Sequence, residues 1–281
     1  MTPIFNANTV TGIVAESIIT NAVLPPIVRC APLPSIGTRG RLKRVQTGKQ
    51  RMAHVISNTA AQSNPTNHQS GDTVVEEIEL NVVHISKAAG LTAQEQNIGL
   101  NPALLNDGLA RLAEQDIWDN HVSPLIAAAG FGAADVSVLP ASFDETHLED
   151  LIAACVSMPR ALMIQPAARE NIASMLQRGP AGWEYPGIDG IYEIGADVGE
   201  ANTVLAGPEA LAYAVEAPPY TSAPPGEITV KEITLPRLGI PAWQTTWLDR
   251  ATRSAWQSVE LFFGIAPANA AALSYAADPE E

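Results

Sequence analysis

Residues able to do acid–base, metal or nucleophilic chemistry are scattered singly along this 281-residue chain. Asp116 and Asp119 stand three apart in a helical pattern, a spacing more typical of a solvated helix edge than of a metal or acid–base pair. The chain has no G-x-S-x-G elbow, Walker glycine loop, H-E-x-x-H or C-x-x-C motif. Its five histidines are dispersed: His54, His68, His84, His121 and His147. We therefore expect no enzymatic activity, no catalytic residue, no metal site and no cofactor.

The two cysteines, Cys30 and Cys155, are too few and too far apart for a disulfide framework. Cys155 falls on the apolar face of a helical pattern, which predicts a small buried side chain. The N-terminus lacks the basic start and apolar run of a signal peptide, and no stretch reaches the roughly 18 apolar residues of a spanning helix. These features favour synthesis in a reducing cytoplasm and no membrane association.

The most unusual feature is a basic segment without aromatic residues. No Phe, Tyr or Trp occurs between Phe5 and Trp118, and within that gap the only acid from Gly37 to Thr73 is Asp72. Aromatic side chains bury the largest apolar area per residue, so this segment has little with which to build its own core. Its six basic residues are Arg39, Arg41, Lys43, Arg44, Lys49 and Arg51. The pattern predicts an arm that packs against a surface outside the segment itself.

The partner of this arm has three interpretations: nucleic acid, another copy of the chain, or solvent around an ordinary loop. Interleaved aromatics for base stacking are absent, and the net charge of −14 would repel a polyanion from the rest of the surface. The acidic remainder of the chain favours a second copy as the partner. The returning strand carries Glu76, Glu77 and Glu79, which we expect to face the outgoing basic residues.

The first half of the chain divides into an N-terminal arm, two extended segments and a long helix. A short helix is predicted near Ile13 to Val23, before closely spaced prolines. Extended segments are predicted at Arg41 to Gln46 and Arg51 to Ile56, around Thr47-Gly48. From Val74 to Val82, apolar and polar residues alternate as in a half-buried strand. A helix capped by Asn101 is predicted to start at Pro102 and to end or kink before Pro124.

The second half alternates short helices and strands, which makes the fold class α+β. Thr146 and Glu149 resemble a capping box for a helix stopped by Pro159. A helix is predicted from Pro166 to Arg178, closed by Gly179. The predicted strands are Arg160 to Gln165, Thr203 to Ala206, Leu211 to Val215, Ile228 to Leu235 and Ser254 to Phe263.

The order of these elements resembles the major capsid proteins of tailed bacteriophages, which have the Hong Kong 97-type fold. The residues that carry the resemblance are Val82 to Lys87 leading into the helix Leu104 to Ile126, then Ala161 to Pro166, Asn202 to Gly207, Leu211 to Val215 and Arg250 to Ala272. The resemblance implies an N-terminal arm (1–35), an extended loop (36–73), a peripheral domain with a spine helix (74–129 and 246–281) and an axial domain (130–245).

The resemblance also implies a function and partners. The chain would self-assemble into hexamers and pentamers of an icosahedral shell, the virion head around double-stranded DNA, built in the host cytoplasm. The extended loop would lie over the neighbouring subunit, and packaged DNA would be contacted only non-specifically. Because the body begins almost at Met1, a separate scaffolding protein is expected, with a portal and a decoration protein as further partners. An encapsulin-type nanocompartment shell and a soluble α+β enzyme with an unrecognised site are the alternatives.

Overall fold

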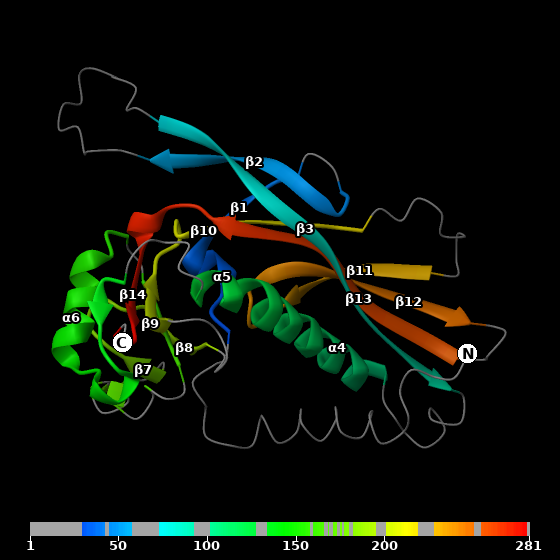
Figure 1. Ribbon diagram of the computed structural model, residues 1–281. Coiled ribbons are helices and arrows are strands. Elements are labelled where there is room, and N and C mark those ends of the chain that lie inside the picture. Colours follow the sequence, from blue (N-terminus) through cyan, green and yellow to red (C-terminus); the bar gives the residue numbers. More distant parts are fainter. Residues whose placement is uncertain are drawn as a thin grey trace, which may run out of the picture.

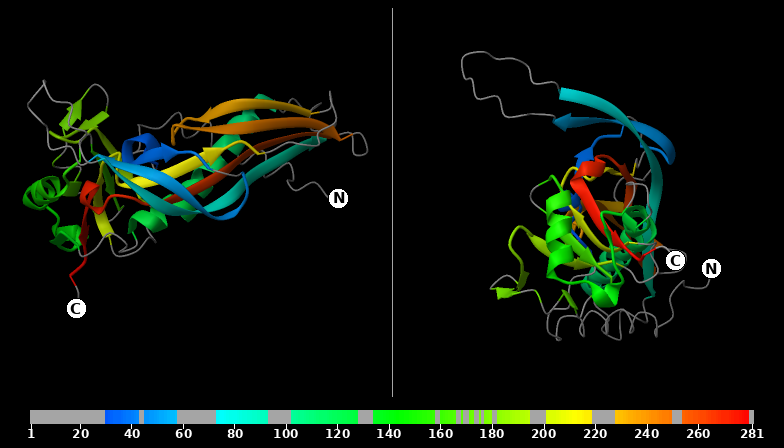
Figure 2. Two further views of the ribbon diagram at one scale, coloured as in Figure 1. Left: turned by 90° about the horizontal axis from the view of Figure 1, so that it is seen from above. Right: turned by 60° about the vertical axis from the view of Figure 1, so that its left-hand side comes forward.

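The computed structural model describes residues 30–42, 45–57, 73–92, 102–127, 134–157, 160–165, 168, 171–172, 175, 177–179, 182–194, 201–218, 228–249 and 254–279. Within these residues the chain forms a long sheet, a compact sheet and a two-stranded ribbon (Figure 1). The long sheet and its helix occupy one end of an elongated molecule, and the compact sheet occupies the other (Figure 2). The fold class predicted from the sequence, α+β, is confirmed.

The long sheet is built around β13 (Ser254–Pro267), which pairs with three other strands. One edge of β13 pairs antiparallel with β12 (Ile240–Asp249) and then with β10 (Leu211–Glu216), and the other edge pairs with β3 (Thr73–Thr92). The sheet is completed by β11 (Ile228–Leu235) beside β12, β1 (Gly37–Gly40) parallel to β10, and β2 (Gly48–Ser57) antiparallel to β3.

The 20-residue strand β3 changes its buried face along its length. Leu80 and Val82 are buried near β2, whereas Ile85, Ala89 and Leu91 are buried further along. Because alternate residues of a strand point to opposite faces, this change from even to odd positions moves the buried side from one face to the other. The second set joins the main core beneath the long helix, and the first set joins a separate small cluster.

The long helix crosses one face of the long sheet (Figure 1). It comprises α4 (Pro102–Ile117), a π-helical turn η1 (Trp118–Val122) and α5 (Ser123–Ala127). Its inner face buries Leu105, Leu109, Ala113 and Ile117 in the main core. The start at Pro102 and the interruption before Pro124 agree with the sequence prediction, since proline has no N–H to donate to the preceding turn.

The compact sheet has the strand order β4 (Val136–Ser137), β14 (Leu273–Ala277), β9 (Ala201–Ala206), β5 (Ala161–Ile164) and β8 (Gly190–Glu193). Helix α6 (Glu145–Ala154) covers one face, where Leu148 and Leu151 pack with Leu162 and Leu205. The other face adds alternate residues, such as Met163, to the main core. This sheet therefore lies between α6 and the core shared with the long sheet.

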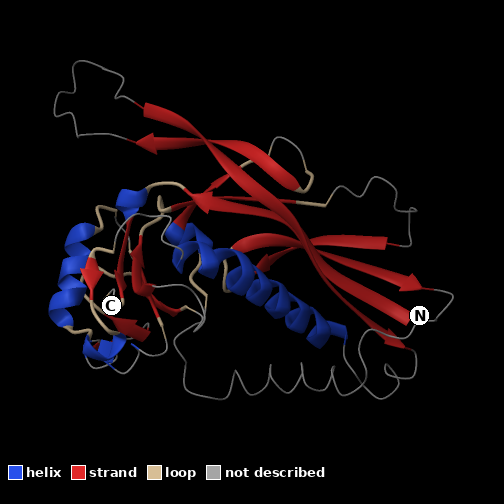
Figure 3. Cartoon of the chain, in the orientation of Figure 1, coloured by secondary structure: helices blue, strands red, loops and turns tan. Residues whose placement is uncertain are grey.

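Short elements connect these layers (Figure 3). They are α2 (Leu33–Ile36), two 3-10 turns, η2 (Pro140–Ser142) and η4 (Ala270–Ala272), and the ribbon of β6 (Gln177–Gly179) with β7 (Gly182–Glu184). The described residues contain no helix long and apolar enough to span a membrane.

All five predicted strands of the second half are present, as β5, β9, β10, β11 and β13. Two predicted elements differ from the structure. The extended segment Arg41 to Gln46 is not a strand where it is described, because β1 ends at Gly40 and β2 begins at Gly48, a glycine with φ of 105°. The helix from Pro166 cannot reach Arg178, because Gln177–Gly179 pairs with β7. The helix expected at Ile13 to Val23 lies outside the described residues.

The sheets group the chain differently from the expected domain limits. Strands β10, β11 and most of β12 fall within residues 130–245 yet belong to the long sheet, and β14 falls within 246–281 yet belongs to the compact sheet. Since a domain limit need not follow a sheet, the division into 1–35, 36–73, 74–129 with 246–281, and 130–245 stays a prediction.

Candidate intersubunit surface

The hairpin of β2 and β3 extends beyond the end of the long sheet (Figure 1). The pairing of β3 with β13 stops at Asn81 opposite Ile265, whereas its pairing with β2 continues to Thr73 opposite Ser57. Among the residues that the structure describes, residues 73–80 of β3 thus pair with β2 alone. This projecting hairpin contains much of the basic segment that the sequence singled out.

The outer face of the hairpin carries two ion pairs. Lys49 Nζ lies 2.7 Å from Glu79 Oε1, and Arg51 Nη1 lies 3.3 Å from Glu77 Oε2. The hydrogen bond and the charge of Lys49 lower the pKa of Glu79, and Glu79 in turn raises the pKa of Lys49. All four side chains are exposed, so these contacts set the charge pattern of the hairpin more than its stability.

The inner face of the hairpin closes a small apolar cluster. Met52, Leu80 and Val82 pack against Ala212 and Ala214 of β10, with Ala266 of β13. A Cβ atom at Gly40 would overlap the Met52 side chain, so glycine at residue 40 lets β1 and Met52 pack closely without a shift of that side chain. The base of the hairpin is therefore held by packing on β10 and β13 of the same chain, whereas the sequence pattern favoured a second copy as the partner of this segment.

The remaining predicted contact residues differ in what the structure shows. Arg39 is exposed and its Nη2 donates a hydrogen bond to the Val215 carbonyl oxygen at 3.2 Å, which ties it to β10. Arg41 is exposed on the segment after β1. Glu76 lies opposite His54 in the β2–β3 register. Lys43 and Arg44 lie outside the described residues. The prediction that basic and acidic strands pair is confirmed within the chain, and their contact with another subunit stays a prediction.

A row of neighbouring residues centred on two tryptophans crosses four strands of the long sheet, and the sequence patterns did not predict it. Ile228, Trp247, Trp256 and Gly90 are neighbours in register across β11, β12, β13 and β3. We call them the tryptophan row. The two indole rings stack with centroids 5.9 Å apart, and Trp256 lies against Gly90, where a Cβ would come within 2.7 Å of its ring.

The tryptophan row lies on the face of the sheet opposite α4. Val259, Leu261 and Phe263 of β13 point into the main core, so the even-numbered Trp256 points to the other face. Both tryptophans are half-buried, and Val230 on the same face is 42% exposed. In the sequence, the tryptophan row is marked by two tryptophans nine residues apart, Trp247 and Trp256. These become neighbours only if their segments pair as a hairpin.

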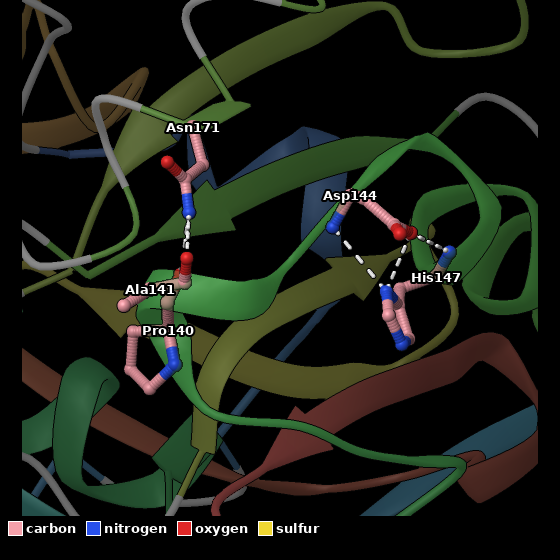
Figure 4. Close-up of polar contacts among 5 residues, drawn as sticks. All are labelled: Pro140, Ala141, Asp144, His147 and Asn171. Carbon is pink, nitrogen blue, oxygen red and sulfur yellow. Dashed lines mark hydrogen bonds and ion pairs between the residues drawn. The ribbon is translucent and has the colours of Figure 1, made fainter.

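A second group of polar contacts lies on the compact sheet side and fixes loops (Figure 4). The Asp144 carboxylate accepts a hydrogen bond from the His147 N–H at 3.1 Å, and the Asp144 N–H donates to His147 Nδ1 at 3.3 Å. This pair caps α6, so the capping box predicted at Thr146 and Glu149 is wrong. Asn171 Nδ2 donates to the carbonyl oxygens of Pro140 and Ala141 at 3.2 and 2.6 Å.

These polar groups form caps and loop contacts rather than a reacting centre. Within the part of the chain that the structure describes, no three His, Cys, Asp or Glu side chains converge as metal ligands. Asp116 accepts from Lys87 at 2.7 Å and from Asn120, while Asp119 is exposed. Both cysteines are buried, as expected for Cys155, and neither forms a disulfide.

No protein-family model and no curated protein matches this sequence. Solved structures do match. The capsid of cyanophage P-SCSP1u is similar with a TM-score of 0.51 and 10% sequence identity, covering 92% of this chain and 91% of that chain. A virus-like particle from Pyrococcus furiosus has a TM-score of 0.48 and 14% identity over 96% and 98%, and the mature capsid of bacteriophage PhiM1 has 0.47 and 8% over 92% and 90%.

The chain has the Hong Kong 97-type fold of phage capsid structures, as its sequence resemblance predicted. The similarity to the cyanophage capsid, which spans nine-tenths of both chains, carries this conclusion. At 10% identity it establishes the fold and leaves the function to be argued from the chain itself.

Proposed function

We propose that this chain is the major capsid protein of a tailed bacteriophage. It assembles in the host cytoplasm into hexamers and pentamers of an icosahedral head that encloses the double-stranded DNA genome. The observation that carries the proposal is the β2–β3 hairpin, which leaves the long sheet while its base is held by packing. A projection whose outer face bears four exposed charged side chains is suited to contacting a second copy.

The surface of the second copy is proposed to be the tryptophan row. Its half-buried indoles and the exposed Val230 form an apolar strip on a sheet face that no described helix covers. Aromatic residues are enriched at the centres of protein interfaces, and surrounding charges set the orientation of the partner. We propose that Arg41, Lys43 and Arg44 lie over this face, where Glu232 of β11 is an exposed acidic residue.

The other partners follow from the same role. A separate scaffolding protein, a portal and a decoration protein are the proposed protein partners, and packaged DNA meets the inner surface without sequence specificity. The chain is proposed to act structurally, without catalysis. Residues 1–35 would serve as an arm, 36–73 as the extended loop, 74–129 with 246–281 as the peripheral domain and 130–245 as the axial domain.

Electron microscopy of the purified, expressed chain tests the proposal. We expect closed shells of uniform diameter, and particles isolated from the producing cells should contain nuclease-protected DNA. Closed shells that enclose a specific protein in place of DNA would instead assign a nanocompartment. A discrete monomer that never assembles, with or without a co-expressed scaffolding protein, would contradict both shell functions.

A further inference from the structure

A buried carboxyl group lies on the inner side of the long helix. Glu114 of α4 is only 1% exposed, although it is a charged residue type that is rarely buried without a partner. It faces the turn between β11 and β12, Pro236 to Gly239, which connects the end of one strand at Leu235 to the start of the next at Ile240.

The two oxygens of this carboxyl group have different surroundings. Oε1 accepts a hydrogen bond from the backbone N–H of Arg237 at 2.6 Å, and the nearby backbone N–H of Leu238 helps to lower the pKa of the carboxyl group. Oε2 is buried and has no hydrogen-bond partner. An ionised oxygen without a donor is costly in a buried site, whereas a protonated carboxyl group carries no net charge there.

The same turn also contacts the Leu33–Ile36 segment, α2. The Leu33 N–H donates to the Leu238 carbonyl oxygen at 2.9 Å, and both leucines are fully buried. Gly239 has φ of 66° and lies against this segment, with Pro34 Cδ 3.5 Å from the position of a Cβ. The turn thus connects α4 on one side with α2 on the other. We call Leu33, Glu114, Arg237 and Leu238 the turn junction.

The charged groups that act on Glu114 come from two elements. Arg111 lies one turn earlier on α4 and Arg237 lies in the turn, and α2 contributes no titratable side chain. Burial raises the pKa of Glu114 more than the two backbone donors and the two arginines lower it. A raised pKa in the folded state means that folding takes up a proton in the pH range between the unfolded and the folded values.

We propose that Glu114 makes the turn junction proton-sensitive: the β11–β12 turn and the Leu33–Ile36 segment are held against α4 most firmly when the carboxyl group is protonated, and less firmly when it is ionised. The device does not depend on the proposed capsid role, since every group in it belongs to one chain. Its consequence is that acidity changes how tightly the Leu33–Ile36 segment and the β11–β12 turn are held against α4.

Amide hydrogen exchange of the unassembled full-length chain, measured by NMR over a pH series and corrected for intrinsic exchange, tests this. Protection of the Leu33 and Arg237 amides should fall as pH rises above the ordinary carboxyl range, by up to about tenfold per pH unit over the titration of Glu114. Glu114→Gln should abolish this dependence. Asp107→Asn, at an exposed position of the same helix, should retain it.

A direct titration of the Glu114 side-chain carboxyl carbon in the wild-type chain keeps the test independent of whether Glu114→Gln folds. A midpoint above that of ordinary glutamates supports the proposal. A midpoint at or below the ordinary value, or equal pH dependence of protection in wild type and Glu114→Gln, would overturn it.

Discussion

Lys49 Nζ lies 2.7 Å from Glu79 Oε1, although the residue directly opposite Lys49 in the β2–β3 register is Asn81. Arg51 repeats this offset, since it lies opposite Glu79 and contacts Glu77. Each cation therefore contacts a carboxylate two residues closer to Thr73 than its register partner. Both ion pairs run diagonally across the two strands. These four side chains are therefore paired within one chain while they stay exposed to a partner.

Exchanging the charges of one rung should leave the subunit stable. In Lys49→Glu/Glu79→Lys the pair is retained with reversed polarity, and both positions are exposed, so we expect the thermal unfolding midpoint of wild type. Lys49→Glu alone places like charges side by side and should lower the midpoint slightly at low salt, with the difference disappearing at high salt. A large salt-independent loss in the double variant would show that the rung has a packing role.

Reversing the basic residues before β2 should prevent or weaken shell formation without unfolding the subunit. We expect Arg41→Glu/Lys43→Glu/Arg44→Glu to remain soluble and folded by circular dichroism, while electron micrographs show few or no particles. The matched control Arg41→Lys/Lys43→Arg/Arg44→Lys keeps every charge and should assemble. Normal particles from the charge-reversed variant would contradict an intersubunit role for this segment.

The contact between Gly40 and Met52 should appear as a coupling in denaturant unfolding. Gly40→Ala places a methyl group where the Met52 side chain lies. The overlap should reduce the free energy of unfolding by about 1–3 kcal/mol. Met52→Ala leaves a cavity and should cost about 2–5 kcal/mol. The double variant should lose less than the sum, because alanine at position 52 makes room for the added methyl group. Additive losses would mean that the two residues do not touch in solution.

The cap of α6 should depend on Asp144 and not on Thr146. Asp144→Ala removes the acceptor for the His147 N–H and should lower the unfolding midpoint at neutral pH, whereas Thr146→Ala should have little effect. The His147 backbone N–H lowers the pKa of Asp144. The stabilisation is therefore present above the ordinary aspartate pKa and is lost as pH falls through the lower folded value. Asp144→Asn should keep the cap without this pH dependence, and a pH-independent difference between wild type and Asp144→Asn would refute the assignment.

Sequence patterns predicted those elements whose signals are local. Pro102 marks the start of α4. The predicted strand Ile228–Leu235 has the same first and last residues as β11, because turn-forming residues flank it in the sequence. Strand β12 was missed because Pro241, its second residue, is typical of a loop, and a proline is accommodated there only near the end of a strand. The capping pair Asp144 and His147 was missed because the usual signature has Glu or Gln three residues after the cap.

Features that depend on distant neighbours were not predictable from one sequence. The change of buried face in β3, between Val82 and Ile85, occurs where the strand passes from the small cluster near β10 to the core beneath α4. In the candidate site, opposite charges on neighbouring strands predicted pairing in general. The diagonal offset of Lys49 and Glu79 and the stacking of Trp247 on Trp256 required the register.

The π-helical turn at Trp118–Val122 has a consequence for chain length. Within it the Ser123 N–H bonds to the Trp118 carbonyl oxygen, five residues back, so this turn holds one residue more than an α-helical turn. Removing one residue here would restore regular α-helix while Ile117 and Ile126 keep their places on the buried side. Relatives that differ by a single-residue insertion or deletion at this point would therefore retain the same core, and an alignment gap there would record a local change of winding.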